Sequence, residues 1–235
     1  MKHFLYISLF LFIACKEGNH QTNNEPLPPF WNDIREFKKQ DSISFPPKNA
    51  ILLIGSSSFT MWKDVQDYFP NYTIVNRGFG GSTLLDQIRY ANDIIFPYEP
   101  KQIVIYCGEN DLASSDTVTA TMVVDRFKEL YKMIREKTEA PIAYVSMKPS
   151  PSRRHLFPKM RGANMVIMLF MAEQDPNKML RSSFYSGPAV FIDIHNKMLN
   201  EKGEPMPEIF LNDSLHMNEK GYAIWKKEIE PYLIK

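Results

Sequence analysis

The sequence predicts an α/β domain in which helices cover both faces of a parallel sheet. Three observations support this prediction. Short apolar runs rich in β-branched residues recur along the chain, longer segments with helical spacing separate them, and polar residues directly follow the first three runs. Alternating strands and helices are typical of parallel sheets. In such folds, ligands bind beyond the carboxyl ends of the strands.

Five segments are predicted as strands, because each is short, rich in β-branched residues and almost free of polar interruptions. This pattern is expected of strands that are buried on both faces. The segments are 51–54, 73–75, 103–106, 142–145 and 190–192.

Three helices are predicted from apolar residues that recur on one face. Thr83 and Asp86 are spaced as a capping box at the start of the first helix. The second helix precedes the fourth strand, and the third opens near Asn218. The three apolar faces are Leu84, Ile88, Ala91 and Ile95; Phe127, Leu130 and Ile134; and Tyr222, Trp225 and Ile229.

A further apolar run covers residues 165–172 and is much too short to span a bilayer. We expect a buried or partly buried helix there. The alternative is a surface that faces lipid or binds an acyl chain, because methionine-rich surfaces adapt to varied apolar partners.

The N-terminus of this 235-residue chain has the features of a leader. Lys2 and His3 precede an apolar run over 4–14, which suits the core of a signal peptide. The run ends in Phe12-Ile13-Ala14-Cys15, which resembles the bacterial lipobox. We expect residues 1–15 to be a lipoprotein signal peptide ending at a lipidated Cys15, with a plain secretory signal as the alternative.

The polar stretch 16–29 is predicted to be a flexible tether, and residues 30–235 a single domain. A lipid on Cys15 would attach this domain to the membrane in the bacterial cell envelope, outside the cytoplasm. The net charge of +1 gives no electrostatic reason to expect nucleic acid as a partner. With Cys15 lipidated, Cys107 would be unpaired, and we expect it to be a buried apolar residue rather than a nucleophile.

Four segments carry residues suited to chemistry. The turn Gly55-Ser56-Ser57-Ser58 follows the first strand, and a serine hydroxyl becomes a nucleophile when a base accepts its proton. A helix N-cap or a solvated loop is the alternative.

The second segment contains three glycines in residues 76–83, which could expose backbone N–H groups toward a negative charge. A phosphate-binding loop or a simple tight turn would also fit this pattern.

The third segment, Gly108-Glu109-Asn110-Asp111, offers a side-chain amide that could donate to an oxyanion, or else forms an Asx turn. The fourth is Asp213-Ser214-Leu215-His216, where the carboxylate could orient the imidazole. A metal-ligand pair or a helix cap is possible there too, although no cluster of His, Cys or carboxylates supplies further metal ligands. Asp193-Ile194-His195 is a competing acid–histidine pair.

Taken in this order, the four segments resemble the blocks of the SGNH hydrolase superfamily, and more closely a GDSL-type, platelet-activating-factor-acetylhydrolase-like bacterial subgroup. The resemblance runs from about Ala50 to Leu233. It implies a three-layer α/β/α sandwich of flavodoxin-like type with a five-stranded parallel sheet. The sequence departs from the family pattern at Ser56, where the family has Asp. This change leaves three adjacent serines, so Ser56 and Ser58 stay as lesser nucleophile candidates.

The resemblance also implies site residues and a reaction. Ser57 would be the nucleophile, His216 the general base and Asp213 its orienting carboxylate. The oxyanion hole would consist of the Ser57 and Gly81 backbone N–H groups and the Asn110 side chain. No metal or organic cofactor is needed for this chemistry.

Several basic residues are expected at the rim of the pocket, where they could bind an anionic or sugar substrate. Arg77, Lys148 and Arg153 are the main candidates, with Ser150, Arg154 and His155 nearby. A solvated loop, with Arg153 paired to a carboxylate, is the alternative.

We expect a serine carboxylic-ester hydrolase that removes small acyl groups, for example O-acetyl groups of a glycan. A lysophospholipase or lipid esterase is the alternative within the class. A non-catalytic glycan-binding lipoprotein is the alternative outside it.

Overall fold

The computed structural model describes residues 26–175 and 187–235. Within them the chain forms one five-stranded parallel sheet in the order β2-β1-β3-β4-β5. The strands are β1 (Ile51–Gly55), β2 (Ile74–Asn76), β3 (Gln102–Tyr106), β4 (Ile142–Val145) and β5 (Ala189–Ile192). The predicted fold class and all five predicted strands are thus confirmed. The expected signal peptide, Cys15 and most of the 16–29 tether lie outside the described residues.

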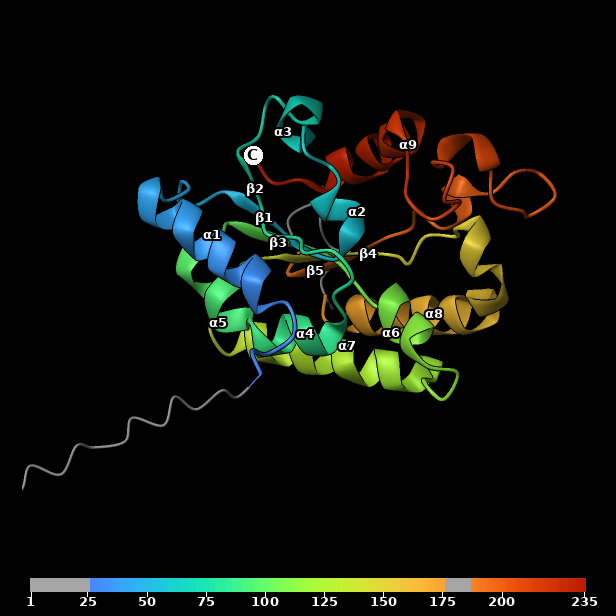
Figure 1. Cartoon of the computed structure of the whole chain (residues 1–235), viewed down its shortest axis with the longest axis horizontal. Helices are drawn as coiled ribbons and strands as arrows, with labels where there is room; N and C mark the ends of the chain where they lie inside the picture. Colours follow the sequence, from blue (N-terminus) through green and yellow to red (C-terminus); the bar gives the residue numbers. More distant parts are fainter. Residues whose placement is uncertain (1–25, 176–186) are drawn as a thin grey trace, which may run out of the picture.

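Helices cover both faces of the sheet and complete three layers (Figure 1). One face carries α1 (Trp31–Ile43), α4 (Leu84–Arg89), α5 (Ala91–Ile94), α6 (Glu109–Ser114), α7 (Ala120–Arg135) and α8 (Phe157–Glu173). The other carries α2 (Ser57–Thr60), α3 (Val65–Tyr68) and α9 (Glu219–Ile229). Short 3₁₀ turns include η1 (Phe96–Tyr98), η2 (Pro151–Leu156), η4 (Asn196–Met198), η5 (Pro207–Ile209) and η6 (Glu230–Tyr232).

Side chains alternate along the strands between two hydrophobic clusters, one on each face. On β1, Leu52 and Ile54 pack toward α4 and α7, whereas Ile51 and Leu53 pack toward α9. All four side chains are buried. Each contributes about 1.5–3 kcal/mol relative to an exposed side chain, so continuous apolar strands favour this two-sided burial.

The three predicted helices are present, with one difference. Thr83 and Asp86 form the expected capping box at the start of α4. The pattern predicted one helix through Ile95, but the chain breaks at Tyr90 into α4 and α5. The Tyr90 ring packs edge-on against Phe79, and its hydroxyl donates to the Pro29 carbonyl oxygen. These contacts with distant residues determine its conformation.

The other two helices match their predicted faces. Phe127, Leu130 and Ile134 of α7 are fully buried. The Asn218 side chain caps α9 by accepting from the backbone N–H groups of Lys220 and Gly221. The apolar positions of α9 predicted from the sequence are all buried.

The apolar run 165–172 lies in α8 and is only partly buried. Ile167 and Met171 face the core, but Met165 is 60% exposed and Leu169 is 54% exposed. The expected partly buried helix is therefore present. No helix in the described part of the chain has both the length and the apolar character needed to cross a membrane.

Candidate active site

The pairing of β1 with β3 brings two of the predicted segments side by side. Gly55 is in register with Tyr106, and the Ser56 N–H donates to the Tyr106 carbonyl oxygen at 3.1 Å. Gly55 has a φ of +141°, and a Cβ built on it would lie 1.9 Å from that oxygen. Only glycine fits there. The serine turn and the segment from Gly108 to Asp111 therefore leave the sheet at the same edge.

Of the three adjacent serines, Ser57 has its hydroxyl next to a histidine ring. Ser57 Oγ lies 3.1 Å from His216 Nε2. Ser56 and Ser58 are both buried, and Ser58 Oγ has no hydrogen-bond partner among the described residues. Ser57 is also the first residue of α2, so its backbone N–H has no partner within that helix.

The turn Asp213–His216 holds the second ring nitrogen of the histidine. His216 Nδ1 lies 2.6 Å from Asp213 Oδ2, while Asp213 Oδ1 accepts from the backbone N–H groups of Leu215 and His216 at 2.9 Å. Partial desolvation would raise the pKa of Asp213, but the hydrogen bonds from His216 and Leu215 outweigh it and lower the pKa to about 2. Asp213 thus stays ionised beside the imidazole at neutral pH.

The competing pair, Asp193 and His195, is not arranged in this way. His195 is buried, and its Nδ1 lies 2.8 Å from the Met147 carbonyl oxygen. Asp193 instead accepts hydrogen bonds from the backbone and side chain of Asn196. Burial lowers the pKa of His195, so its ring is neutral at physiological pH. Sequence spacing alone could not decide which acid–histidine pair lies next to the serine. The contacts of His216 with Ser57 and Asp213 identify the pair formed by Asp213 and His216.

The glycine segment after β2 lies against Ser57. A Cβ built on Gly80 would be 3.9 Å from the Ser57 Cβ, and Gly81 has a φ of +83°. Asn110 reaches the same segment from the end of β3, where its Nδ2 donates to the Ser82 carbonyl oxygen at 3.0 Å. The structure thus brings together the residues predicted as nucleophile, base, orienting acid and oxyanion donors.

The two residues that flank Asn110 in the sequence, Glu109 and Asp111, both carry buried carboxylates. Asp111 accepts from the Leu84 backbone N–H at 2.9 Å and pairs with Arg126 at 2.8 Å. Burial raises the pKa of Asp111, although both contacts oppose the shift. Glu109, on the other side, is buried as well. The start of α6, which carries Asn110, is thereby tied to α4, to α7 and to the core.

Glu109 is the centre of a buried polar network that the sequence did not reveal. Its carboxylate pairs with Lys148 at 2.8 Å and with Arg153 at 3.1 Å. It also accepts from the hydroxyl groups of Tyr106 and Ser150 at 2.5 and 3.0 Å. Burial would raise the pKa of Glu109, but the two cations outweigh it and lower the pKa. The carboxylate is therefore ionised at neutral pH.

This network corrects the expectation that Lys148 lies at the pocket rim. The Lys148 side chain is buried, and Glu109 takes up its charge. Arg153 pairs with the same carboxylate, as the alternative interpretation proposed, but its side chain keeps 18% exposure. The residues Arg154 and His155 are exposed, and Arg154 pairs with Glu204.

Arg77 is also absent from the rim, because its guanidinium is buried against α1. It pairs with Asp41 at 2.5 Å and donates from Nε to the Tyr98 hydroxyl at 2.7 Å. The Tyr98 hydroxyl donates to the same aspartate. This cluster fastens α1 to the sheet and leaves no charge free for a substrate.

Cys107 has the environment expected of a structural residue. It is fully buried at the end of β3, and burial raises the pKa of its thiol well above the ordinary value. A thiolate nucleophile is therefore disfavoured. Among the described residues, no three His, Cys, Asp or Glu side chains are grouped to hold a metal ion.

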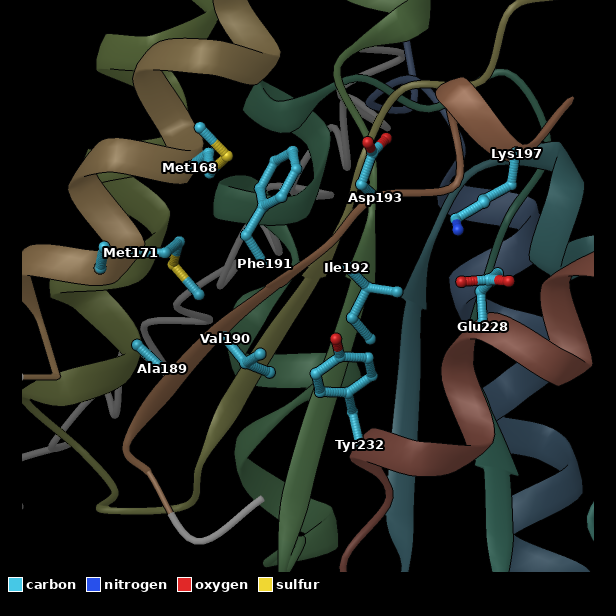
Figure 2. A pocket seen from close by; sticks show the side chains of 11 residues that line it. Met168, Met171, Ala189, Val190, Phe191, Ile192, Asp193, Lys197, Glu228 and Tyr232 are labelled. Atoms are coloured by element: carbon cyan, nitrogen blue, oxygen red, sulfur yellow. The ribbon is translucent and has the colours of Figure 1, made fainter. Parts of the chain in front are cut away.

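A separate cavity of about 320 Å³ lies along β5, the edge strand of the sheet. Figure 2 shows apolar side chains from α8 and β5 on one side of it, with Lys197 and Glu228 on the other. Its lining includes neither Ser57 nor His216. The cluster at the strand ends is therefore distinct from this cavity.

Solved structures with the same fold include three bacterial proteins. One from Streptococcus pneumonia, assigned as a platelet activating factor, is 19% identical with a TM-score of 0.69, over 86% of this chain and 92% of that chain. A GDSL-like lipase from Bacteroides thetaiotaomicron is 16% identical with a TM-score of 0.68, over 84% and 95% of the two chains. An acetylxylan esterase from Geobacillus stearothermophilus, solved as a catalytic mutant, is 14% identical with a TM-score of 0.59, over 80% and 96%.

These similarities define the fold as that of the SGNH-type hydrolases. A model of the GDSL-like lipase/acylhydrolase family matches residues 41–224, most of the chain. The chain therefore belongs to the GDSL-like lipase/acylhydrolase family, and it is a hydrolase that acts on esters. No curated protein matches the sequence.

The Glu109 network leads to a prediction about stability. Replacing Glu109 with Gln should lower the free energy of unfolding at neutral pH by about 3–5 kcal/mol, because Lys148 stays buried without its counter-charge. Because its folded pKa is lowered, Glu109 stabilises fully above the ordinary value of 4.5, and this contribution is lost as pH falls through the lower folded value. Acid should therefore destabilise the wild type more steeply than the variant.

Urea unfolding followed by circular dichroism over a pH series would measure both effects. Glu99→Gln is the matched control, because Glu99 forms an exposed pair with Lys48 and should change stability by less than about 0.5 kcal/mol. Parallel acid profiles for wild type and Glu109→Gln would contradict the assigned role of the carboxylate.

Proposed function

We propose that the protein is a serine carboxylic-ester hydrolase in which Ser57, His216 and Asp213 form the catalytic triad. One observation carries this proposal: the continuous chain of contacts from Ser57 Oγ to His216 Nε2, and from His216 Nδ1 to Asp213 Oδ2. A base within hydrogen-bond reach of a hydroxyl, itself oriented by a carboxylate, is the arrangement that activates serine.

The proposed reaction has two steps. Ser57 Oγ attacks the ester carbonyl carbon while His216 Nε2 takes the hydroxyl proton, and the carbonyl oxygen becomes an oxyanion. When this intermediate collapses, the carbon–oxygen ester bond breaks and His216 returns the proton to the leaving alcohol. His216 then takes a proton from water as the water oxygen attacks the carbonyl carbon of the acyl-enzyme. When this second intermediate collapses, the bond between the acyl carbon and Ser57 Oγ breaks, His216 returns the proton to Ser57 Oγ, and the carboxylic acid leaves.

The oxyanion is proposed to bind to the backbone N–H groups of Ser57 and Gly81 and to the Asn110 amide. The closeness of Gly80 to Ser57 supports this assignment, as does the position of Asn110 against the same segment. Asn110 Nδ2 would exchange its Ser82 acceptor for the developing negative charge. Donors fixed in advance stabilise such a charge without reorganising during the reaction.

We propose small acyl groups, and O-acetyl groups of a glycan in particular, as the natural substrate. The same-fold acetylxylan esterase from Geobacillus stearothermophilus supports an acetylated carbohydrate. The expected position in the bacterial cell envelope, anchored through Cys15, would bring the domain near such glycans. That anchor rests on the leader pattern, and the intact mass of the mature protein would test it.

The nucleophile can be identified with a fluorophosphonate, which transfers its phosphonyl group to an activated serine oxygen and releases fluoride. Wild type should gain one adduct, measured by intact-mass spectrometry, and Ser57→Ala should gain none. Ser58→Ala is the matched control and should label like wild type, because Ser58 is buried and the hydroxyl beside His216 is that of Ser57. Labelling of Ser57→Ala would show that another serine is the nucleophile.

Asn110→Ala should lower kcat by roughly 10²–10³, the usual effect of losing one oxyanion donor, with little change in KM. Steady-state kinetics on an acetyl ester would measure this. Asn196→Ala removes an exposed amide that donates to Asp193 and lies outside the proposed site, and it should leave kcat unchanged. An unaltered kcat in Asn110→Ala would exclude Asn110 from the reaction.

A series of acetyl, butyryl and longer-chain esters separates the proposed function from a lipid esterase. We expect kcat/KM to fall as the acyl chain lengthens, and to be high for an O-acetylated xylo-oligosaccharide. A preference for long chains or lysophospholipids would refute the deacetylase assignment. If neither class of ester is hydrolysed and Ser57 is not labelled, the result would favour a binding protein over an enzyme.

A further inference from the structure

Phe30 has a backbone conformation that a bulky residue rarely adopts. It precedes α1 with a φ of +63° and a ψ of 6°, in the left-handed region. Such a conformation persists only where the surroundings impose it, and it is frequent at functional sites. The question is therefore what the Phe30 side chain gains from this geometry.

The surroundings fix Phe30 through its neighbours on both sides. The Phe30 carbonyl oxygen accepts from the backbone N–H groups of Asp33 and Ile34 and so starts α1. The preceding Pro29 carbonyl oxygen accepts from the Tyr90 hydroxyl at 2.5 Å. The segment before α1 is thereby fastened to the break between α4 and α5.

This geometry directs the Phe30 ring to the glycine segment of the site. The ring packs edge-on against Phe79, with centroids 5.4 Å apart. Its Cε1 lies 3.6 Å from the position that a Cβ on Gly81 would occupy. The neighbouring Gly80 has the Ser57 Cβ at 3.9 Å from the equivalent position. Ser57 thus borders Gly80 and the Phe30 ring borders the adjacent Gly81. Phe30 keeps part of its surface exposed.

Phe30 and the segment of His216 pack on opposite faces of the sheet. Phe30 packs against the hydrophobic cluster that includes Phe79 and Leu84, on the face of α4 and α7. His216 is followed by Met217, which is buried in the cluster on the face of α9. Because His216 must protonate the leaving oxygen, the alcohol part of an ester lies on its side. An acyl substituent directed away from His216, past Gly80 and Gly81, would then meet the Phe30 ring.

We infer that Phe30 is the wall of the acyl-binding site and limits the enzyme to short acyl chains. This inference rests on the proposed function, because it needs Ser57 as nucleophile and His216 as acid. The ring lies beside Gly81, the proposed oxyanion donor, where it would limit the space open to an acyl chain. A longer chain would have to displace the ring, which its contact with Phe79 and the anchored backbone oppose.

The test measures kcat/KM for p-nitrophenyl acetate, butyrate and octanoate with the full-length chain in detergent. Phe30→Gly should raise the octanoate-to-acetate ratio by about 10-fold or more, because the ring no longer excludes the added methylenes. Glycine also accepts the positive φ without strain. Phe30→Leu keeps an apolar side chain against Phe79 and guards against loss of the fold, and should raise the ratio by a smaller factor.

Phe45→Ala is the matched control. Phe45 is a half-exposed aromatic residue that follows α1 and stacks on Tyr98, at a centroid distance of 5.5 Å. Its loss should leave the chain-length ratio unchanged.

Fluorophosphonate labelling in parallel separates the two proposals. If Ser57 is labelled at the wild-type rate in both Phe30 variants but the ratio stays the same, the role of Phe30 is refuted and the nucleophile stands. If wild-type Ser57 is not labelled at all, the proposed function itself fails.

Discussion

The parallel pairing of β1 with β3 is the constraint on which the candidate site depends. Because Gly55 is in register with Tyr106, the serine turn and the segment from Gly108 to Asp111 leave the sheet next to each other. β1 also pairs with β2 on its other side, so the glycine segment joins them at the same edge. The segment of His216 arrives later in the chain. It therefore has to be held in place by contacts other than strand pairing.

One of those contacts is linked to the buried carboxylate of Glu109. Glu109 binds Ser150 and Arg153 at the start of η2, and between them the Ser152 N–H donates to the Ser214 carbonyl oxygen in the turn that carries His216. A carboxylate next to Asn110 is thus linked through one short 3₁₀ turn to the histidine. Lys148 belongs to the same buried network, because its ammonium group pairs with Glu109.

The fold was predictable because it depends on local patterns, whereas the details of the site depend on distant partners. Continuous apolar runs identified every strand, and the capping box located α4. The break at Tyr90 was not predictable from the apolar spacing, which continues through Ile95; the Tyr90 side chain instead contacts Phe79 and Pro29, outside both helices. Nor was the burial of Arg77, whose partner Asp41 lies 36 residues earlier. The choice between His195 and His216 required three-dimensional contacts with Ser57.

The crowded position of Gly55 bears on how related sequences are interpreted. The Tyr106 carbonyl oxygen would collide with any Cβ at this position, so the requirement for glycine comes from the sheet and not from the reaction. A descendant that had lost its nucleophile would still need that glycine to pair its strands. In this chain, then, the glycine at position 55 reports an intact sheet, and only the hydroxyl at position 57 bears on the proposed reaction.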